Sequence, residues 1–210
     1  MTGEQPIIIV TDGRAHRVAG TLVSHLGLAL RAGRGAIGAV LVREKSASLD
    51  ELKKILSELR PICEQVAAKL LVHTHVELVS NRFAHGVHVS GDIDQVLKLR
   101  EKIRCSIGFS AHSVAEIVSA GKAGVDYVFY SPIFSPLSKV DERPVVGISG
   151  LACAVEVAEI PIFALGGISA NNAGSCRRAG ANGIAVLSSV MNASDVEEAV
   201  VRLVHAWRRG

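Results

Sequence analysis

Two short apolar runs near the end of the chain finish in residues that suit a phosphate group. The run at 161–166 leads into Gly166 and Gly167, and the run at 183–188 ends in Leu187 and Ser188. Glycine leaves its backbone amide uncovered, and a serine hydroxyl adds a hydrogen-bond donor for an anion. In a (β/α)8 barrel, the loops after strands seven and eight form the usual phosphate site. If six strands precede these two, we expect an enzyme with a phosphorylated small-molecule substrate.

A pair of cations follows an earlier apolar run. Arg43 and Lys45 are two residues apart in an extended segment, so both can point the same way while Glu44 points to the other face. Two cations on one face suit a phosphate or a diphosphate. The alternative is an ion-paired strand end that holds no ligand.

A histidine with a neighbouring serine marks the end of another run. His112 lies two residues after Ser110, just before a predicted helix. Imidazole exchanges protons near neutral pH, so His112 is the best candidate for a general acid or base. A purely structural histidine is the alternative.

Three further histidines, His73, His75 and His88, fall at or near strand ends. Together they could bind a transition metal, since imidazole nitrogen is a common ligand. Their spacing alone is weak evidence, and we favour hydrogen-bonded histidines at the rim of the barrel.

The elements that would position these residues alternate along the whole chain. Short β-branched runs predict strands near 7–12, 37–44, 69–75, 85–90, 105–110, 126–131, 161–166 and 183–188. Helical periodicity predicts helices over 18–31, 48–67, 76–83, 93–103, 113–123, 149–157, 171–179 and 194–208. Ser48 with Glu51, and Ser194 with Glu197, have the spacing of capping boxes. We therefore predict one α/β domain over 1–210, a single (β/α)8 TIM barrel, with an open doubly wound sheet as the alternative.

Composition narrows the class of protein. A net charge of +3 from dispersed basic residues does not indicate nucleic-acid binding. No apolar run approaches the roughly 18 residues that span a bilayer, and the four cysteines lack the C-x-x-C spacing. We expect a soluble cytoplasmic protein with free thiols and no membrane partner, and a homo-oligomer stays open.

Taken together, these segments resemble the thiamine-phosphate synthase superfamily, which includes the TenI-like thiazole tautomerases. The matching segments, in chain order, are 9–12, 42–45, 86–89, 107–113, 126–128, 132–134 with Lys139, 164–168 and 183–186. Each is weak alone, but their order and spacing are specific, and they cover nearly the whole chain. The resemblance implies the same barrel.

The resemblance also implies roles for individual residues. Synthases of this family join a thiazole phosphate to an aminopyrimidine methyl diphosphate, with loss of pyrophosphate and help from Mg²⁺. Arg43, Lys45 and Lys139 match the family's diphosphate-binding cations, and Ser110 matches its serine after strand five. The thiazole-phosphate cradle matches Gly166, Gly167, Leu187 and Ser188.

The departures fall on the pyrimidine side of the site. Leu41 stands where synthases have glutamine, and His73 and Thr74 stand where they have Asn-Asp, so the magnesium aspartate is missing. Asp92 could serve as an acidic metal ligand only in a shifted register. Pro136 and Ser138 stand where synthases have two threonines.

These departures favour the tautomerase branch, which shifts a proton to aromatise a thiazole carboxylate phosphate and whose histidine matches His112. That reaction needs no metal cofactor, and we expect catalysis by His112 and Ser110 with His73, Ser138 and the cations binding substrate. The first alternative is a thiamine-phosphate synthase with Mg²⁺, held by Asp92, Asp94 or Asp12. The others are a non-catalytic phosphate-binding accessory barrel and an isomerase barrel of another pathway.

Overall fold

The computed structural model describes residues 5–11, 13, 21–135 and 143–210. Its eight parallel strands pair in chain order, and β8 closes back on β1. The strands are β1 (Ile7–Val10), β2 (Ile37–Val42), β3 (Lys69–His73), β4 (Gly86–Val89), β5 (Ser106–Ala111), β6 (Tyr127–Tyr130), β7 (Ile162–Leu165) and β8 (Gly183–Val186). The closed ring confirms the predicted (β/α)8 barrel and rules out the open sheet.

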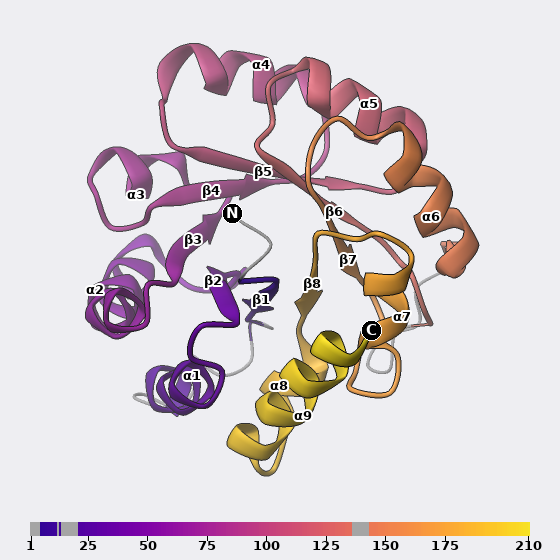
Figure 1. Ribbon diagram of the computed structural model, residues 1–210. Coiled ribbons are helices and arrows are strands. Elements are labelled where there is room, and N and C mark those ends of the chain that lie inside the picture. The colour runs from indigo at the N-terminus through magenta and orange to yellow at the C-terminus, as the bar shows by residue number, and fades with distance from the viewer. Residues whose placement is uncertain (1–4, 12, 14–20, 136–142) are drawn as a thin grey trace.

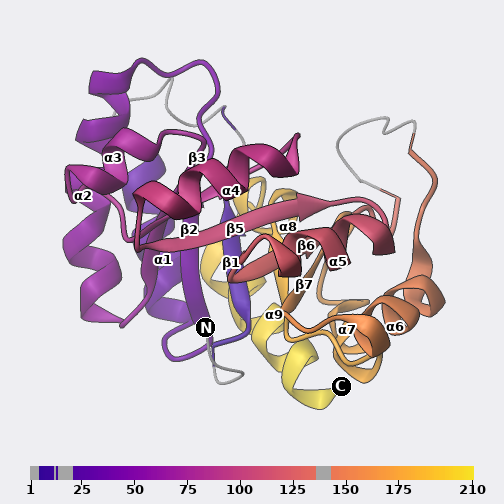
Figure 2. The ribbon, with the colours of Figure 1, turned by 90° about the horizontal axis from the view of Figure 1, so that it is seen from above.

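Helices surround the strands in chain order (Figure 1). They are α1 (Thr21–Ala32), α2 (Leu49–Gln65), α3 (Val76–Ser80), α4 (Ile93–Lys102), α5 (Val114–Lys122), α6 (Gly147–Val157), α7 (Ala173–Arg178), α8 (Ser188–Met191) and α9 (Val196–Arg209). The last helix, α9, packs against the first, α1, so the helical layer closes as the sheet does. Figure 2 shows the same arrangement from above, with the strands between the helices.

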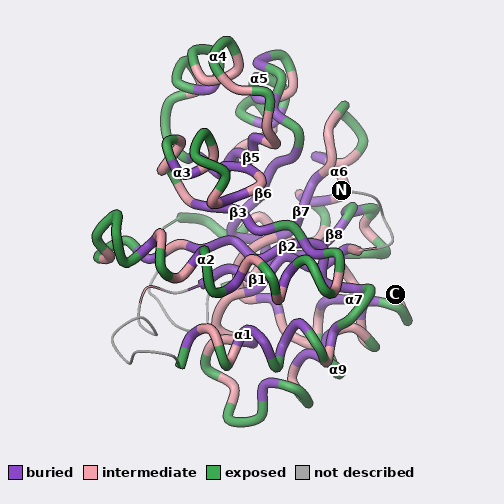
Figure 3. Tube along the Cα trace, turned by 90° about the vertical axis from the view of Figure 1, so that its left-hand side faces the viewer, coloured by how far each residue is buried: buried purple, intermediate pink, exposed green. Residues whose placement is uncertain are grey.

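Side chains alternate along each strand between two cores. One face packs outward under the helices, where it forms the larger cluster that includes Ile9, Val40 and Val72. The other face fills the barrel interior, with Ile8, Val10, Ala39, Leu41, Leu71, Tyr127, Phe129, Phe163 and Ala185. Most strand residues are buried, with exceptions such as the exposed Lys69 at the start of β3, whereas the helices expose their outer faces (Figure 3). A ligand can therefore bind above this packed interior, at the carboxyl ends of the strands.

The helix boundaries test the two predicted capping boxes. Ser48 caps α2 as predicted, because its Oγ accepts from the Glu51 amide while the Glu51 carboxylate accepts from the Ser48 amide. The second prediction was wrong by one residue. Asp195 is the N-cap of α9, and its carboxylate accepts from the Glu198 amide. The short helix α8 was not predicted.

The remaining fold expectations concern the thiols and the membrane. All four cysteines are free thiols, as predicted. One of them, Cys153, is exposed to solvent. Among the described helices, none combines the length and the apolar character that crossing a bilayer requires.

Candidate active site

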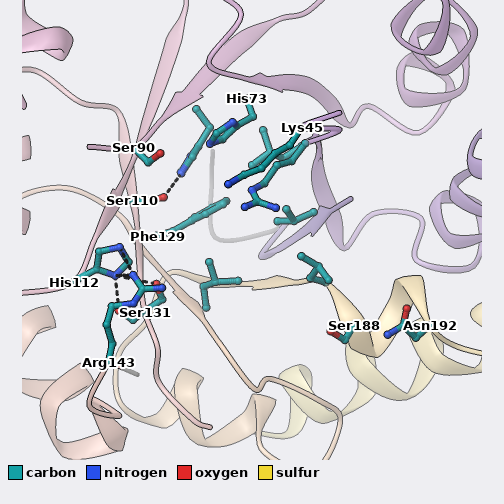
Figure 4. Close-up of a pocket in the computed structure, with 16 residues that line it drawn as sticks. Lys45, His73, Ser90, Ser110, His112, Phe129, Ser131, Arg143, Ser188 and Asn192 are labelled. Carbon is teal, nitrogen blue, oxygen red and sulfur yellow. Dashed lines mark hydrogen bonds between the residues drawn. The ribbon is translucent and has the colours of Figure 1, made fainter. Parts of the chain in front are cut away.

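A cavity of about 390 Å³ opens at the carboxyl ends of the strands. Figure 4 shows the side chains around it. Its lining consists of Val10, Leu41, Arg43, Lys45, His73, His88, Ser90, Ser110, His112, Phe129, Ser131, Arg143, Leu165, Leu187, Ser188 and Asn192. The described lining contains three cations, three histidines and four serines but no carboxylate, so it favours an anionic ligand.

The β2 end supplies two of the cations. Arg43 and Lys45 both line the cavity, as their spacing predicts. Glu44 between them is buried on the other side, where it accepts a hydrogen bond from the Gly13 amide at 3.2 Å. The hydroxyl of Thr11 accepts from the Arg43 amide at 2.8 Å and ties this segment to the end of β1. Burial lowers the pKa of the Arg43 guanidinium, and the Glu44 carboxylate partly opposes that shift.

His112 lies on the side of the cavity that β5 and β6 form. Its Nδ1 lies 2.8 Å from the backbone oxygen of Ser131, which suits donation of the ring N–H to that oxygen. Its Nε2 then carries the lone pair and lies 2.6 Å from Nη1 of Arg143. Figure 4 shows these two side chains together, away from Lys45 and His73. The ring is thus oriented, and a donor occupies the nitrogen that could act as a base.

Two histidines reach the cavity from β3 and β4, but His75 does not. His73 and His88 line the cavity and stack with ring centroids 6.5 Å apart. Thr74 adopts a left-handed backbone conformation with φ of 64°, which ends the strand and turns His75 away to cap α3. His75 instead approaches Glu77, its Nδ1 lying 3.1 Å from the carboxylate. The three histidines therefore form no common cluster.

Burial keeps His73 uncharged. It lowers the pKa of His73 to about 4, with a further contribution from the nearby charges of Arg43 and Lys45. A neutral imidazole can accept or donate a hydrogen bond to substrate without adding to the positive charge of the cavity.

The predicted phosphate cradle is only partly in the cavity. Leu187 and Ser188 line it, and Ser188 is the first residue of α8. Gly166 and Gly167 lie at the end of β7 outside the lining, with φ of 100° and 61°. A Cβ on Gly167 would come 2.5 Å from the backbone oxygen of Ser135, so close packing against the loop after β6 also requires glycine there.

Asn172 holds this glycine segment in place. Its side chain donates to the backbone oxygen of Gly167 at 2.9 Å and accepts from the Ser169 amide at 2.8 Å. Such a bridge fixes the loop after β7 beside the cavity.

The described residues do not fit a Mg²⁺ ion held by protein carboxylates. Magnesium prefers oxygen ligands and is usually bound through one or two carboxylates. Asp92, the candidate ligand on β4's side, is exposed and caps α4 by accepting from the Asp94 amide at 3.0 Å. Within the described ranges, no group of three His, Cys, Asp or Glu residues could hold a metal ion.

The predicted site residues and the observed cavity lining do not coincide fully. Asp12, Ser138 and Lys139 lie outside the described residues. The cavity lining also includes Phe129, Ser131, Arg143 and Asn192, which were not predicted as ligand-binding residues, and Ser90, which ends the predicted strand 85–90. Ser131 is the last residue of the predicted strand 126–131 and could have been found from that position, whereas Arg143 comes from a segment without regular periodicity.

The fold and the cavity together define a class, the (β/α)8 barrels with a cation-lined cavity at the carboxyl ends of the strands. Comparison with known proteins narrows this class. The family model for thiamine monophosphate synthase matches residues 7–190, and this chain belongs to the thiamine-phosphate synthase/TenI superfamily.

Individual relatives agree with that assignment. The chain is 35% identical over 198 residues to a thiamine-phosphate synthase of Chloroflexus aurantiacus, covering 94% of this chain and 90% of the relative. It is 38% identical over 175 residues to one of Bacillus cereus, covering 81% and 80%. A thiamine phosphate pyrophosphorylase from Pyrococcus furiosus has a similar structure, with a TM-score of 0.84, 28% identity, and coverage of 99% and 97%.

The comparisons bear on the choice between a thiazole tautomerase and a thiamine-phosphate synthase. Both curated relatives are named synthases, which supports the synthase alternative better than the tautomerase that the sequence favours. The members of this family are enzymes. The cation-lined cavity of this chain is consistent with its membership of the family.

Proposed function

We propose that this chain is a thiamine-phosphate synthase. The observation that supports the proposal is the combination of synthase relatives with two sets of residues in one cavity lining that suit anions. Arg43 and Lys45 form one wall, and Leu187 with Ser188 forms the other. A reaction that joins two phosphorylated molecules needs a place for each of them.

In this proposal the two walls have different tasks. Arg43 and Lys45 bind the diphosphate of the aminopyrimidine, and the resemblance to the family assigns Lys139, which lies outside the described residues, to the same group. The Ser188 hydroxyl, with backbone amides near Gly167, binds the thiazole phosphate. The thiazole nitrogen bonds to the pyrimidine methylene carbon as the bond from that carbon to the diphosphate oxygen breaks.

Electrostatics then favour the departure of pyrophosphate. The leaving group takes the bonding electron pair, so negative charge grows on the oxygen that was bonded to the methylene carbon. Cations already in position stabilise that charge without reorganising, and the low polarity of Leu41 and Phe129 strengthens the effect. Mg²⁺ in solution can screen the charge of a diphosphate further.

A thiazole tautomerase is the second candidate, and the described lining gives a specific reason for it. It contains no carboxylate, and Nδ1 of His112 faces a backbone oxygen, which leaves Nε2 for proton transfer. A thiazole carboxylate could pair with Arg143 and draw it from that nitrogen. Protonation and deprotonation at Nε2 would then shift the proton.

Two assays on the purified chain separate the candidates. One mixes the aminopyrimidine diphosphate, thiazole phosphate and Mg²⁺; the other supplies the unaromatised thiazole carboxylate phosphate alone. We expect thiamine phosphate in the first assay. Turnover only in the second would replace the synthase by the tautomerase, and ligand binding without turnover in either would favour an accessory barrel.

Variants assign the activity to this cavity. Arg43→Gln is expected to lower kcat/KM in the first assay about 100-fold, in keeping with the loss of a charge-assisted contact to a leaving group. The exposed Lys54→Gln on α2 removes the same charge outside the cavity lining and serves as the control. His112→Asn is expected to abolish the second activity while affecting the first much less.

A further inference from the structure

The interior of the barrel contains a hydrogen-bonded chain directly below the cavity. The Tyr127 hydroxyl lies 3.2 Å from Nδ1 of His88, and Nε2 of His88 lies 2.9 Å from Oγ of Ser110. His88 and Tyr127 are each 1% exposed, whereas Ser110 reaches the cavity. Three strands, β6, β4 and β5, thus contribute one polar path through an otherwise apolar interior.

We propose that Tyr127 and His88 are positioning residues that commit Ser110 to donate its hydroxyl hydrogen to an oxyanion of the ligand. The proposal rests on the anion-binding cavity of the proposed function. It adds the direction of one hydrogen bond, the one between Ser110 and the ligand. It assigns to Ser110 a preference for a ligand oxygen that accepts, such as one of a diphosphate or phosphate.

The direction follows from counting hydrogens. A neutral imidazole has one N–H, so one ring nitrogen donates and the other accepts. Within the described residues, the Tyr127 hydroxyl has no hydrogen-bond partner besides His88. If Nδ1 carried the hydrogen, the buried Tyr127 hydroxyl would have no acceptor, which is unfavourable.

The satisfied arrangement is therefore unique. Tyr127 donates to Nδ1 of His88, and the N–H at Nε2 donates to Oγ of Ser110. Since Oγ of Ser110 accepts from below, its own hydrogen is free to point into the cavity. The serine then favours an acceptor on the ligand over a donor.

The surroundings keep His88 neutral and its ring fixed. Burial lowers the pKa of His88 to about 3, with smaller contributions from His73 on β3 and Arg43 on β2. Phe129 stacks on the ring with centroids 4.1 Å apart. A charged ring would have hydrogens on both nitrogens and would break the contact from Tyr127.

Gly108 makes the space that this chain occupies. A Cβ at Gly108 would overlap the Tyr127 ring and lie 2.5 Å from Nδ1 of His88. The residue two positions before Ser110 on β5 therefore has to be glycine for the two rings to meet. Gly108 and Ser110 belong to the same short segment of β5. Gly108 leaves space for the Tyr127 and His88 rings, and Ser110 ends their hydrogen-bonded chain.

The tautomer can be observed directly in the ligand-free protein. Long-range ¹⁵N–¹H correlation NMR of the ¹⁵N-labelled chain distinguishes a protonated Nε2 from a protonated Nδ1, and His88 is assigned by its loss in His88→Gln. We expect a protonated Nε2 that stays unchanged from pH 5 to pH 8. A protonated Nδ1, or a ring that titrates in that range, would overturn the proposal.

Binding of inorganic pyrophosphate, measured by calorimetry, tests the coupling. We expect Ser110→Ala to weaken binding about tenfold, Tyr127→Phe about threefold, and the double variant no more than Ser110→Ala alone. Tyr130→Phe, on the same strand but facing the helices, is the matched control and should bind normally. Additive losses would contradict action through Ser110.

These measurements do not depend on turnover. If the chain forms no thiamine phosphate, the tautomer and the pyrophosphate affinities still decide the proposal. If it does form thiamine phosphate but the double variant is additive, the synthase assignment stands and the positioning role fails. Should His88→Gln not fold, Tyr127→Phe identifies the His88 signal by its changed chemical shift, because the Tyr127 hydroxyl lies 3.2 Å from Nδ1 of His88.

Discussion

At the scale of single residues, the cavity depends on side chains that come together from distant parts of the sequence. Arg143 meets His112 across 31 residues, and Tyr127 meets His88 across 39. Strand-end positions made His112, Ser110, Arg43 and the serine of α8 predictable. The contact partners of these residues were not predictable, because no local pattern specifies which side chains face one another across a barrel.

Two neighbouring serines at the end of β8 allow a sharp test of the phosphate wall. Ser188 lines the cavity, whereas Oγ of Ser189 is buried and has no hydrogen-bond partner in the described structure. Ser188→Ala is expected to weaken binding of thiazole phosphate about tenfold, the typical effect of losing a hydrogen bond to a charged group. Ser189→Ala should leave the affinity and the free energy of unfolding nearly unchanged. Calorimetry that shows equal losses for both variants would remove Ser188 from the wall.

At the scale of elements, the apolar periodicity located all eight strands but extended most of them too far. The pattern marks buried positions, and these continue beyond the strand ends, as at Thr11 after β1 and Glu44 after β2. Helix starts were predictable where one capping residue stood alone, as at Ser48. Ser194 and Asp195 are both competent caps, and only the structure shows that Asp195 is used.

The contact between β5 and β6 can be tested through Gly108. Gly108→Ala places a methyl group against Tyr127 and is expected to lower the free energy of unfolding by about 1–3 kcal/mol or more, as overpacking does. Gly121→Ala in α5 is the control, since its Cβ would meet only ordinary contacts at 3.8 Å and alanine favours helix. Urea unfolding measures both variants, and an unchanged Gly108→Ala protein would show that the two rings can separate without cost.

At the scale of the whole molecule, the barrel encloses uncharged histidines near its cavity. Burial lowers the pKa of His88 to about 3 and that of His73 to about 4, below the usual 6.5 of the unfolded chain. Between pH 6.5 and about 4 the unfolded chain therefore binds more protons than the folded one. Stability must fall as the pH decreases through that window, and these two groups contribute no change above it.

Unfolding by urea at a series of pH values checks this sign. In the wild type, the free energy of unfolding should decrease from pH 6.5 toward pH 4. His88→Gln should reduce the slope by about one proton, or about 1.4 kcal/mol per pH unit, in the lower part of the window. A slope that is the same in both proteins would mean that His88 is protonated in the folded barrel.

The most direct test of the central claim is the product balance in a single turnover. The wild-type chain is mixed in excess with the aminopyrimidine diphosphate, thiazole phosphate and Mg²⁺, and thiamine phosphate and pyrophosphate are quantified together. We expect the wild type to form both products in equal amounts. The Arg43→Gln variant should form both of them much more slowly. Absence of thiamine phosphate, or pyrophosphate released without it, would contradict the assignment of this cavity to thiamine-phosphate synthesis.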